Sequence, residues 1–145
     1  MLLSTLRPAA RSLVGVVGAL LLLGALAGCT SPGSKPVTDY TGEPKGVIAP
    51  PSSAGGAAYA VWMKNGAQYG IVLYGSSTCP PRVASVDVLA SNQLKANLAP
   101  IDGGVCTQDL VPHTTVFATP SSVTTTSDVT IKLPDSTLTL PALRG

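Results

Sequence analysis

The chain is 145 residues long, and 45% of its residues are hydrophobic and 11% are charged. This composition is too apolar for a wholly disordered chain, and the length fits one small domain. Two of the nine basic residues, Arg7 and Arg11, lie near the N-terminus, and the other seven balance the seven acidic residues. Because the chain lacks the basic stripe that neutralises phosphates, the sequence excludes nucleic acid as a partner.

The N-terminal segment has the pattern of a secretory signal. Arg7 and Arg11 precede an uncharged, apolar run over 13–26, which ends shortly before Cys29. A positively charged start, a short apolar run and small residues predict a signal peptide over residues 1–28. The run is barely long enough to span a bilayer, and a permanent membrane anchor is the alternative.

The tetrapeptide Leu26-Ala27-Gly28-Cys29 resembles the lipobox of bacterial lipoproteins. The resemblance implies that a diacylglyceryl group is attached to the Cys29 thiol and that the peptide bond before Cys29 is then cut. Small residues such as Ala27 and Gly28 let a peptidase approach the backbone. Two acyl chains, palmitate among them, hold a protein stably on a bilayer. We therefore expect an extracytoplasmic protein anchored at the outer face of the cell membrane, with no cofactor besides this covalent lipid.

Residues 29–56 are predicted to be a lipidated Cys29 followed by a tether. Ten of the 27 residues from Thr30 to Gly56 are Pro or Gly, which disfavours both helices and strands. The segment is therefore expected to be a disordered spacer that lifts the following domain off the membrane. The alternative is that part of it forms a strand or covers an edge of the domain.

The remaining residues, 57–145, are predicted to form a mainly β domain, and a hairpin is its clearest signal. Two runs rich in strand-forming residues, 57–64 and 67–74, flank the dipeptide Asn65-Gly66. Both residues of that dipeptide tolerate the positive φ that a type I′ turn requires. The sequence therefore predicts two antiparallel strands joined by a tight turn.

The length of this turn fixes the register of the hairpin. A two-residue turn makes Lys64 face Ala67, which places Trp62 opposite Tyr69 on one face of the ribbon. Neither face of the hairpin is truly polar. We therefore expect the hairpin in the middle of a sandwich or small barrel, with Trp62 in the core.

Further short runs of strand-forming residues follow, separated by turn residues and without intervening helices. Together they predict a small antiparallel β-sandwich, or a partly open barrel, of about seven strands. Beyond the hairpin, the expected strands are Val83–Leu89, Gln93–Ile101, Thr114–Ala118, Val129–Leu133 and Thr137–Leu140.

With Cys29 assigned to the lipid, Cys79 and Cys106 remain as a pair in an exported domain. A disulfide between them is the expected outcome in an oxidising compartment. By the chain-entropy model, closing a loop of this length stabilises the fold by about 3.5 kcal/mol. The bridge would pin the loop after the hairpin to a later loop.

A second resemblance covers the region from Trp62 to Pro120. The stretches Gly75–Pro80 and Cys106–Pro112, placed after a Trp-bearing hairpin, resemble a pattern in small actinobacterial lipoproteins of unknown function. The resemblance implies an exported, disulfide-bonded domain. It implies no activity.

The residue types of catalytic and metal sites do not combine into a complete set. A cysteine nucleophile beside His113 and Asp109 loses its thiol when the disulfide forms. A zinc site made from both cysteines and His113 lacks a fourth ligand. Asp102 and Asp109 offer the carboxylate pair of a glycosidase, but a turn and a loop cap explain them more simply. The sequence therefore predicts no catalytic residue and no metal site.

The leading hypothesis is a binding or structural module, not an enzyme, whose partner is an unidentified envelope polymer or protein. Loops joined and rigidified by a disulfide are suited to binding. The candidate binding residues are Gly75, Ser76, Ser77, Asp102, Asp109 and His113.

Two other functions stay open. An enzyme that modifies envelope polymers would use Asp102, Asp109 or His113 as acid–base groups. An accessory subunit of an envelope complex would need an exposed patch, for which the second face of the hairpin, with Tyr59 and Tyr74, is the candidate.

Overall fold

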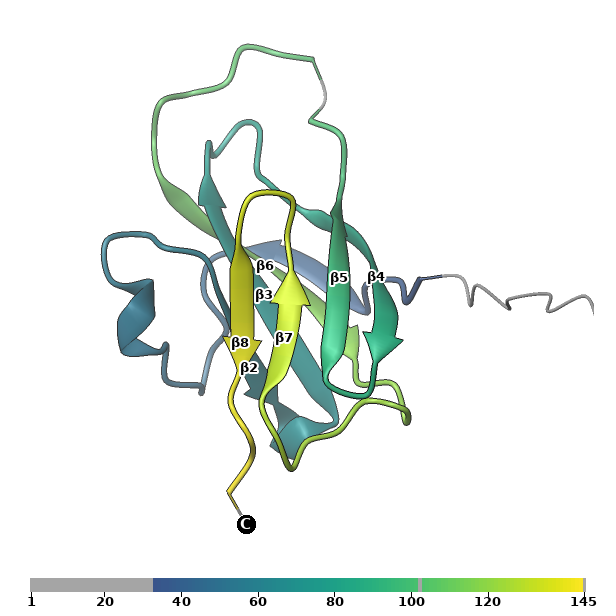
Figure 1. Cartoon of the computed structure of the whole chain (residues 1–145). Helices are drawn as coiled ribbons and strands as arrows, with labels where there is room; N and C mark the ends of the chain where they lie inside the picture. The colour runs from purple at the N-terminus through teal and green to yellow at the C-terminus, as the bar shows by residue number, and fades with distance from the viewer. Residues whose placement is uncertain (1–32, 102, 145) are drawn as a thin grey trace, which may run out of the picture.

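A computed structural model of the chain describes residues 33–101 and 103–144 (Figure 1). The predicted signal peptide, the lipobox-like tetrapeptide and Cys29 lie outside the described residues. Over the described ranges, none of the helices is long and apolar enough to cross a membrane.

The described residues form eight strands in two sheets that pack face to face, which confirms a mainly β sandwich without barrel closure. The first sheet has the order β1-β6-β3-β2, and the second has the order β4-β5-β7-β8. The strands are β1 Thr38–Thr41, β2 Tyr59–Met63, β3 Gln68–Gly75, β4 Val83–Ala90, β5 Gln93–Leu98, β6 Val111–Ala118, β7 Val129–Lys132 and β8 Thr137–Leu140, and two short 3-10 helices are η1 Pro51–Ser53 and η2 Lys64–Gly66.

The predicted register of the hairpin is confirmed, because Trp62 pairs with Tyr69 between β2 and β3. Asn65 and Gly66 have φ of 53° and 85°, and the Ala67 amide donates to the Lys64 carbonyl at 3.1 Å. These are the features of a type I′ turn. Lys64 also has a positive φ, of 49°, so the ladder ends one pair earlier than expected.

The two strands of the hairpin have different positions in the first sheet. Only β3 is central, because β2 forms the edge of the first sheet. This edge strand lies beside β8 of the second sheet, and the contact keeps β2 inside the sandwich. Three of the five residues of β2 are buried and the other two are half-buried. Because both faces of the strand are packed, its sequence lacks a polar face.

One strand pair departs from the predicted antiparallel arrangement. β5 and β7 are parallel, with Leu94 opposite Ile131. Between them the chain crosses to the first sheet, runs along β6 in the opposite direction and crosses back. The chain thus reverses its direction twice between β5 and β7. As a result, β7 runs in the same direction as β5 beside it (Figure 1).

The expectation that residues 30–56 contain no strand is wrong. β1 pairs with β6, and its Thr and Tyr residues are good strand formers on the otherwise open side of that strand. Before it, Ser34 exchanges two backbone hydrogen bonds with Val86 of β4, at 2.7 and 3.0 Å. The alternative reading, an ordered edge cover, therefore describes this part of the segment.

The core lies between the inner faces of the two sheets. The Tyr69 ring is fully buried, stacks on Phe117 with a centroid distance of 5.6 Å, and meets Trp62 edge-on at 6.1 Å. The Trp62 indole N–H donates to the Pro141 carbonyl at 2.7 Å, which ties the chain after β8 to β2. The aliphatic members of the core include Ile71, Leu73, Val83, Val86, Leu94, Val129, Ile131, Leu138 and Leu140.

The outer face of the first sheet is covered as well, by the segment 42–56. Tyr59 is only 3% exposed, the Tyr74 hydroxyl donates to the Glu43 carboxylate, and the Thr114 hydroxyl donates to the Gly42 carbonyl at 2.6 Å. Burial, and then the charge of Glu43, raise the pKa of Tyr59. The second face of the hairpin is therefore not an exposed aromatic patch.

Candidate binding site at the disulfide-linked loops

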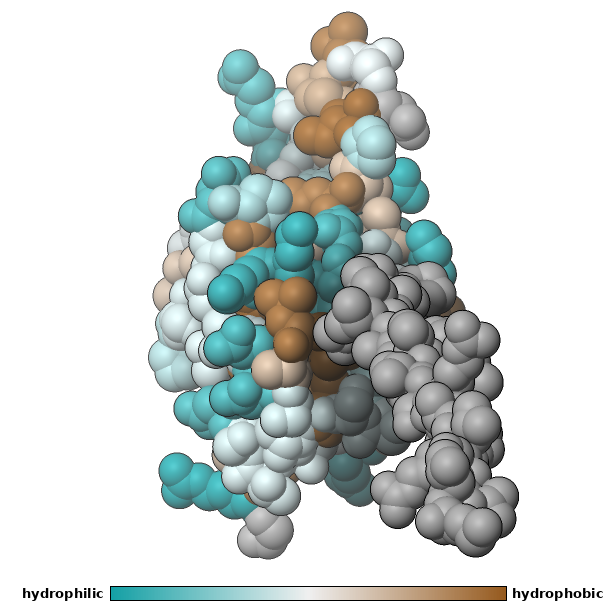
Figure 2. All heavy atoms as spheres, turned by 45° about the vertical axis from the view of Figure 1, so that its right-hand side comes forward, coloured by the Kyte–Doolittle hydropathy of each residue, from teal (hydrophilic) through white to brown (hydrophobic). Residues whose placement is uncertain are grey.

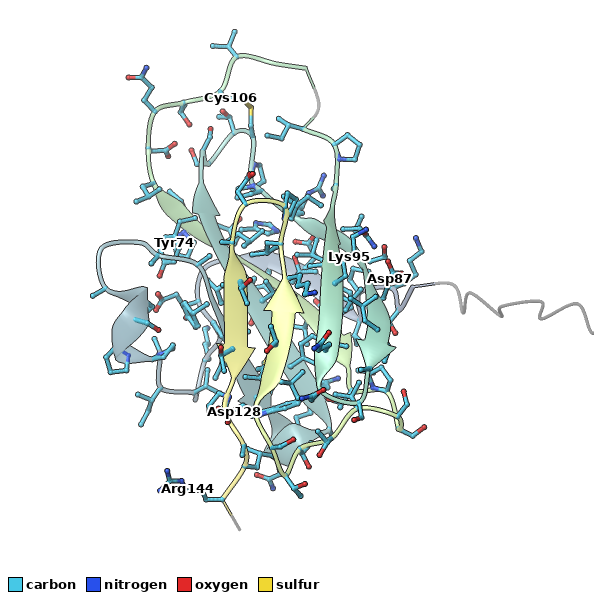
Figure 3. All side chains as sticks on the ribbon, viewed as in Figure 1. Tyr74, Asp87, Lys95, Cys106, Asp128 and Arg144 are labelled. Carbon is cyan, nitrogen blue, oxygen red and sulfur yellow. A yellow bond between two sulfur atoms is a disulfide. The ribbon has the colours of Figure 1, made fainter. Side chains whose placement is uncertain are left out.

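The Cys79–Cys106 disulfide is present, with an S–S distance of 2.06 Å and 5.4 Å between the two Cα atoms. It joins the loop after β3 to the loop before β6, and it lies beyond the strand ends of both sheets (Figure 3). We call the described residues of 75–82 and 99–110 the disulfide end. The predicted bridge between these loops is confirmed.

Gly75 starts the disulfide end and allows the first loop to fold back. A Cβ at Gly75 would approach the Cδ atom of Pro81 to 2.7 Å, so only glycine fits against this proline ring. The close approach turns the chain after β3 toward the second loop, where Cys106 lies.

Hydroxyl groups connect the two loops beside the disulfide. Ser76 and Thr107 share a hydrogen bond of 2.8 Å between their hydroxyl oxygens. The Thr78 hydroxyl donates to the Val105 carbonyl at 3.2 Å and accepts from the Thr107 amide at 3.1 Å. Ser and Thr side chains replace backbone partners here, which suits loops without a ladder. The sequence reasoning named Ser76 but missed Thr78 and Thr107, because their role depends on contacts some 30 residues apart.

Asp109 anchors this network with its charge. One of its carboxylate oxygens accepts from the Ser77 amide at 3.0 Å and from the Thr107 hydroxyl. Hydrogen bonds from Ser77, and then from Thr107, lower the pKa of Asp109 to about 2. At neutral pH Asp109 is therefore a fixed anion that holds the two loops together, consistent with its predicted place in the binding loops.

The disulfide end turns apolar side chains toward solvent. Val105 is 96% exposed, Ile101 63% and Leu110 60%. Figure 2 shows hydrophobic residues gathered at the end of the molecule that these loops form. A pocket of about 200 Å³ lies beside the disulfide, lined by Thr78, Cys79, Pro80, Arg82, Pro100 and Ile101.

His113 lies elsewhere, which corrects its expected position on the loop surface. It belongs to β6, is only 6% exposed, and its Nε2 contacts an Asp39 carboxylate oxygen. The other Asp39 oxygen is 3.9 Å from the Arg82 guanidinium. No pattern in the sequence indicated this pairing, because Asp39 lies in β1, within the expected spacer.

The predicted site residues thus fall into two groups. Ser76, Ser77 and Asp109 meet at the disulfide end, whereas His113 is buried in β6, beside Asp39 of β1. Asp102 lies outside the described residues. Across the ranges 33–101 and 103–144, no three His, Cys, Asp or Glu side chains are grouped as a metal site requires.

Comparisons of the chain with protein-family models, with curated proteins and with solved structures found no significant match.

Proposed function

We propose that this protein is a lipid-anchored component of the bacterial cell envelope whose small β-sandwich serves as a binding or structural module. The binding surface is the disulfide end. The observation that carries this proposal is a pair of loops that are fixed covalently and by hydrogen bonds, and that nevertheless expose Val105, Ile101 and Leu110. Exposed apolar clusters on a rigid support are typical of interaction sites.

The location outside the cytoplasm rests on two independent features. A structural disulfide persists in oxidising compartments, and Cys79 and Cys106 form one. The tetrapeptide that ends at Cys29 resembles a lipobox, and it follows two arginines and an apolar run. Both features fit a protein that is exported and then held on the outer face of the membrane by two acyl chains.

The positions of Asp109 and His113 favour a binding role over catalysis. Asp109 is occupied by Ser77 and Thr107, and His113 is occupied by Asp39 in the body of the sandwich. A general acid–base pair needs its members around one substrate position. We therefore assign Asp109 a role in loop structure, and His113 a role in joining β1 to β6.

Metabolic labelling tests the anchor. The full chain is produced in a lipoprotein-processing bacterium that is fed an alkyne analogue of palmitate, and the purified protein is examined for label. We expect the wild-type chain to carry label and Cys29→Ser to carry none. The double variant Cys79→Ser/Cys106→Ser is the matched control, because it removes two thiols but keeps Cys29, and it should carry label like the wild type. An unlabelled wild type, or a labelled Cys29→Ser, would contradict the proposal.

A further inference from the structure

We infer that the disulfide end inserts Val105 and Ile101 into the surface of the same bilayer that holds the lipid on Cys29. This inference rests on the proposed anchor and specifies the partner of the disulfide end as membrane lipid. Three observations support it: the short chain between Cys29 and the sandwich, the place where that chain joins the fold, and the chemistry of the exposed residues.

The chain between the proposed lipid and the folded domain is short. Ser34 already pairs with Val86, so five residue steps separate Cys29 from the second sheet. At the maximum reach of an extended chain these steps span about 18 Å. A disordered spacer that extended to residue 56, as the sequence predicted, would have placed the domain well away from the bilayer. With β1 and Ser34 in the fold, the domain is instead held against the bilayer.

The chain enters at the side of the sandwich, where Ser34 pairs with Val86 in the middle of β4, and the disulfide end lies beyond the first residue of that strand (Figures 1 and 3). Val86 follows Val83, the first residue of β4, by three positions, which is about 10 Å along a strand. Directly before Val83, the Arg82 carbonyl accepts from the Ala99 amide at 2.8 Å, at the base of the second loop. The disulfide end therefore reaches the bilayer only when the molecule tilts with its β4 edge toward the membrane, which keeps Ser34 within the span of the short chain from Cys29.

The exposed side chains suit lipid. They are aliphatic, and transfer of aliphatic surface out of water is favourable without a specific partner. Protein interfaces draw most of their affinity from Trp, Tyr and Arg, whereas Leu and Val are under-represented there. The disulfide and the hydroxyl network already order the loops, so insertion requires little loss of conformational freedom.

The insertion is shallow. Irregular backbone does not enter the hydrocarbon, so the loops lie at the headgroup level with only the side chains deeper. Among its described residues, the disulfide end carries one basic side chain, Arg82, and one acidic side chain, Asp109. Because these two charges balance, we expect insertion without a requirement for anionic or cationic lipid.

Tryptophan fluorescence in vesicles tests the inference. Lipidated Val105→Trp is reconstituted into phosphatidylcholine vesicles whose acyl chains are partly brominated, because bromine quenches tryptophan on contact. The matched control is Ile48→Trp, since Ile48 is 93% exposed and lies in the segment that covers the far side of the first sheet (Figure 1). Trp62, which is 7% exposed, is the same background in both variants.

We expect the Val105→Trp emission to shift to the blue and to lose at least a third of its intensity in brominated vesicles, and the Ile48→Trp emission to stay unchanged. If the mass of the protein shows lipid on Cys29 but Val105→Trp is not quenched, the inference is overturned and the anchor stands. A chain without lipid overturns both. Equal quenching of the two variants overturns the inference, and so does a photo-reactive residue at position 105 that crosslinks in cells to a protein and not to lipid.

Discussion

The body of the sandwich and the disulfide end are ordered by different forces. In the body, Tyr69, Phe117 and the surrounding aliphatic residues are buried, and apolar burial provides the stability. In the disulfide end, the apolar side chains of Val105 and Ile101 face solvent, and a covalent bond and hydroxyl groups fix the backbone. A small domain can therefore expose apolar residues in a fixed arrangement when their order does not depend on burying them.

Removal of an aromatic ring from the body should have the largest effect. Phe117 is fully buried and stacks on Tyr69, so Phe117→Ala leaves a cavity in the core. We expect a loss of about 3–5 kcal/mol in the free energy of unfolding. Urea denaturation followed by Trp62 fluorescence measures this loss. A loss below 1 kcal/mol would show that burial does not dominate the body.

Loss of the disulfide should rank second and should act on one end of the molecule. In the chain-entropy model the bridge of Cys79 and Cys106 contributes about 3.5 kcal/mol. For Cys79→Ser/Cys106→Ser we expect a loss of this order in the free energy of unfolding. Limited proteolysis should cut the folded variant within 99–110 first, while the hairpin stays intact. Cleavage in the hairpin at the same rate would mean that the two regions are not separate.

Contacts of β1 and the segment 42–56, which replace the expected spacer, should contribute less to the free energy of unfolding. Thr114→Val removes the hydroxyl that donates to the Gly42 carbonyl, at a position that is fully buried. Because the partly buried Gly42 carbonyl then lacks this donor, we expect a loss of about 1–2 kcal/mol in the free energy of unfolding. Hydrogen exchange should speed up at the amides of β1 more than at those of β7. Uniform acceleration would contradict a local role.

Acid should loosen the disulfide end before the body. The pKa of Asp109 is about 2 in the folded protein, below its ordinary value of 3.8, because Ser77 and Thr107 donate to the carboxylate. The stabilising effect of this anion is therefore present above about pH 4, and it is lost as the pH falls through 2. We expect proteolysis of the loops by pepsin to rise between pH 4 and 2 in the wild type. Asp109→Asn should remove most of this pH dependence.

A substitution at Val105 should have the smallest effect on the free energy of unfolding. Val105 is 96% exposed, so Val105→Asp should alter the free energy of unfolding by less than about 0.5 kcal/mol. The same change should weaken association with vesicles, because a charge replaces an aliphatic group. A variant that unfolds would show that Val105 packs within the fold, contrary to the contrast between the two regions.

Sequence patterns predicted the parts of the fold that depend on neighbours in the chain. The turn Asn65-Gly66 and the pairing of Trp62 with Tyr69 follow from local chemistry, and both were found. The pairing of β5 with β7 depends on two crossings between the sheets, and no local pattern encodes it. β1 was not predicted, because its four residues lie among Pro and Gly residues and form a strand only by pairing with β6.

The candidate site shows the same division. Two cysteines in a domain that is expected to be exported predicted the bridge that defines the disulfide end, and Asp109 was found within it. The exposure of Val105 was not predicted, since valine is among the residue types most often buried. Nor was the contact of His113 with Asp39, which joins residues 74 positions apart.

The most direct test of the central claim is the intact mass of the detergent-extracted protein, measured with and without reduction after free thiols are blocked. We expect a mass equal to residues 29–145 plus acyl chains, with two further thiols blocked only after reduction. An unprocessed chain without lipid, or cysteines 79 and 106 that are blocked before reduction, would contradict a lipid-anchored envelope protein with a fixed disulfide end.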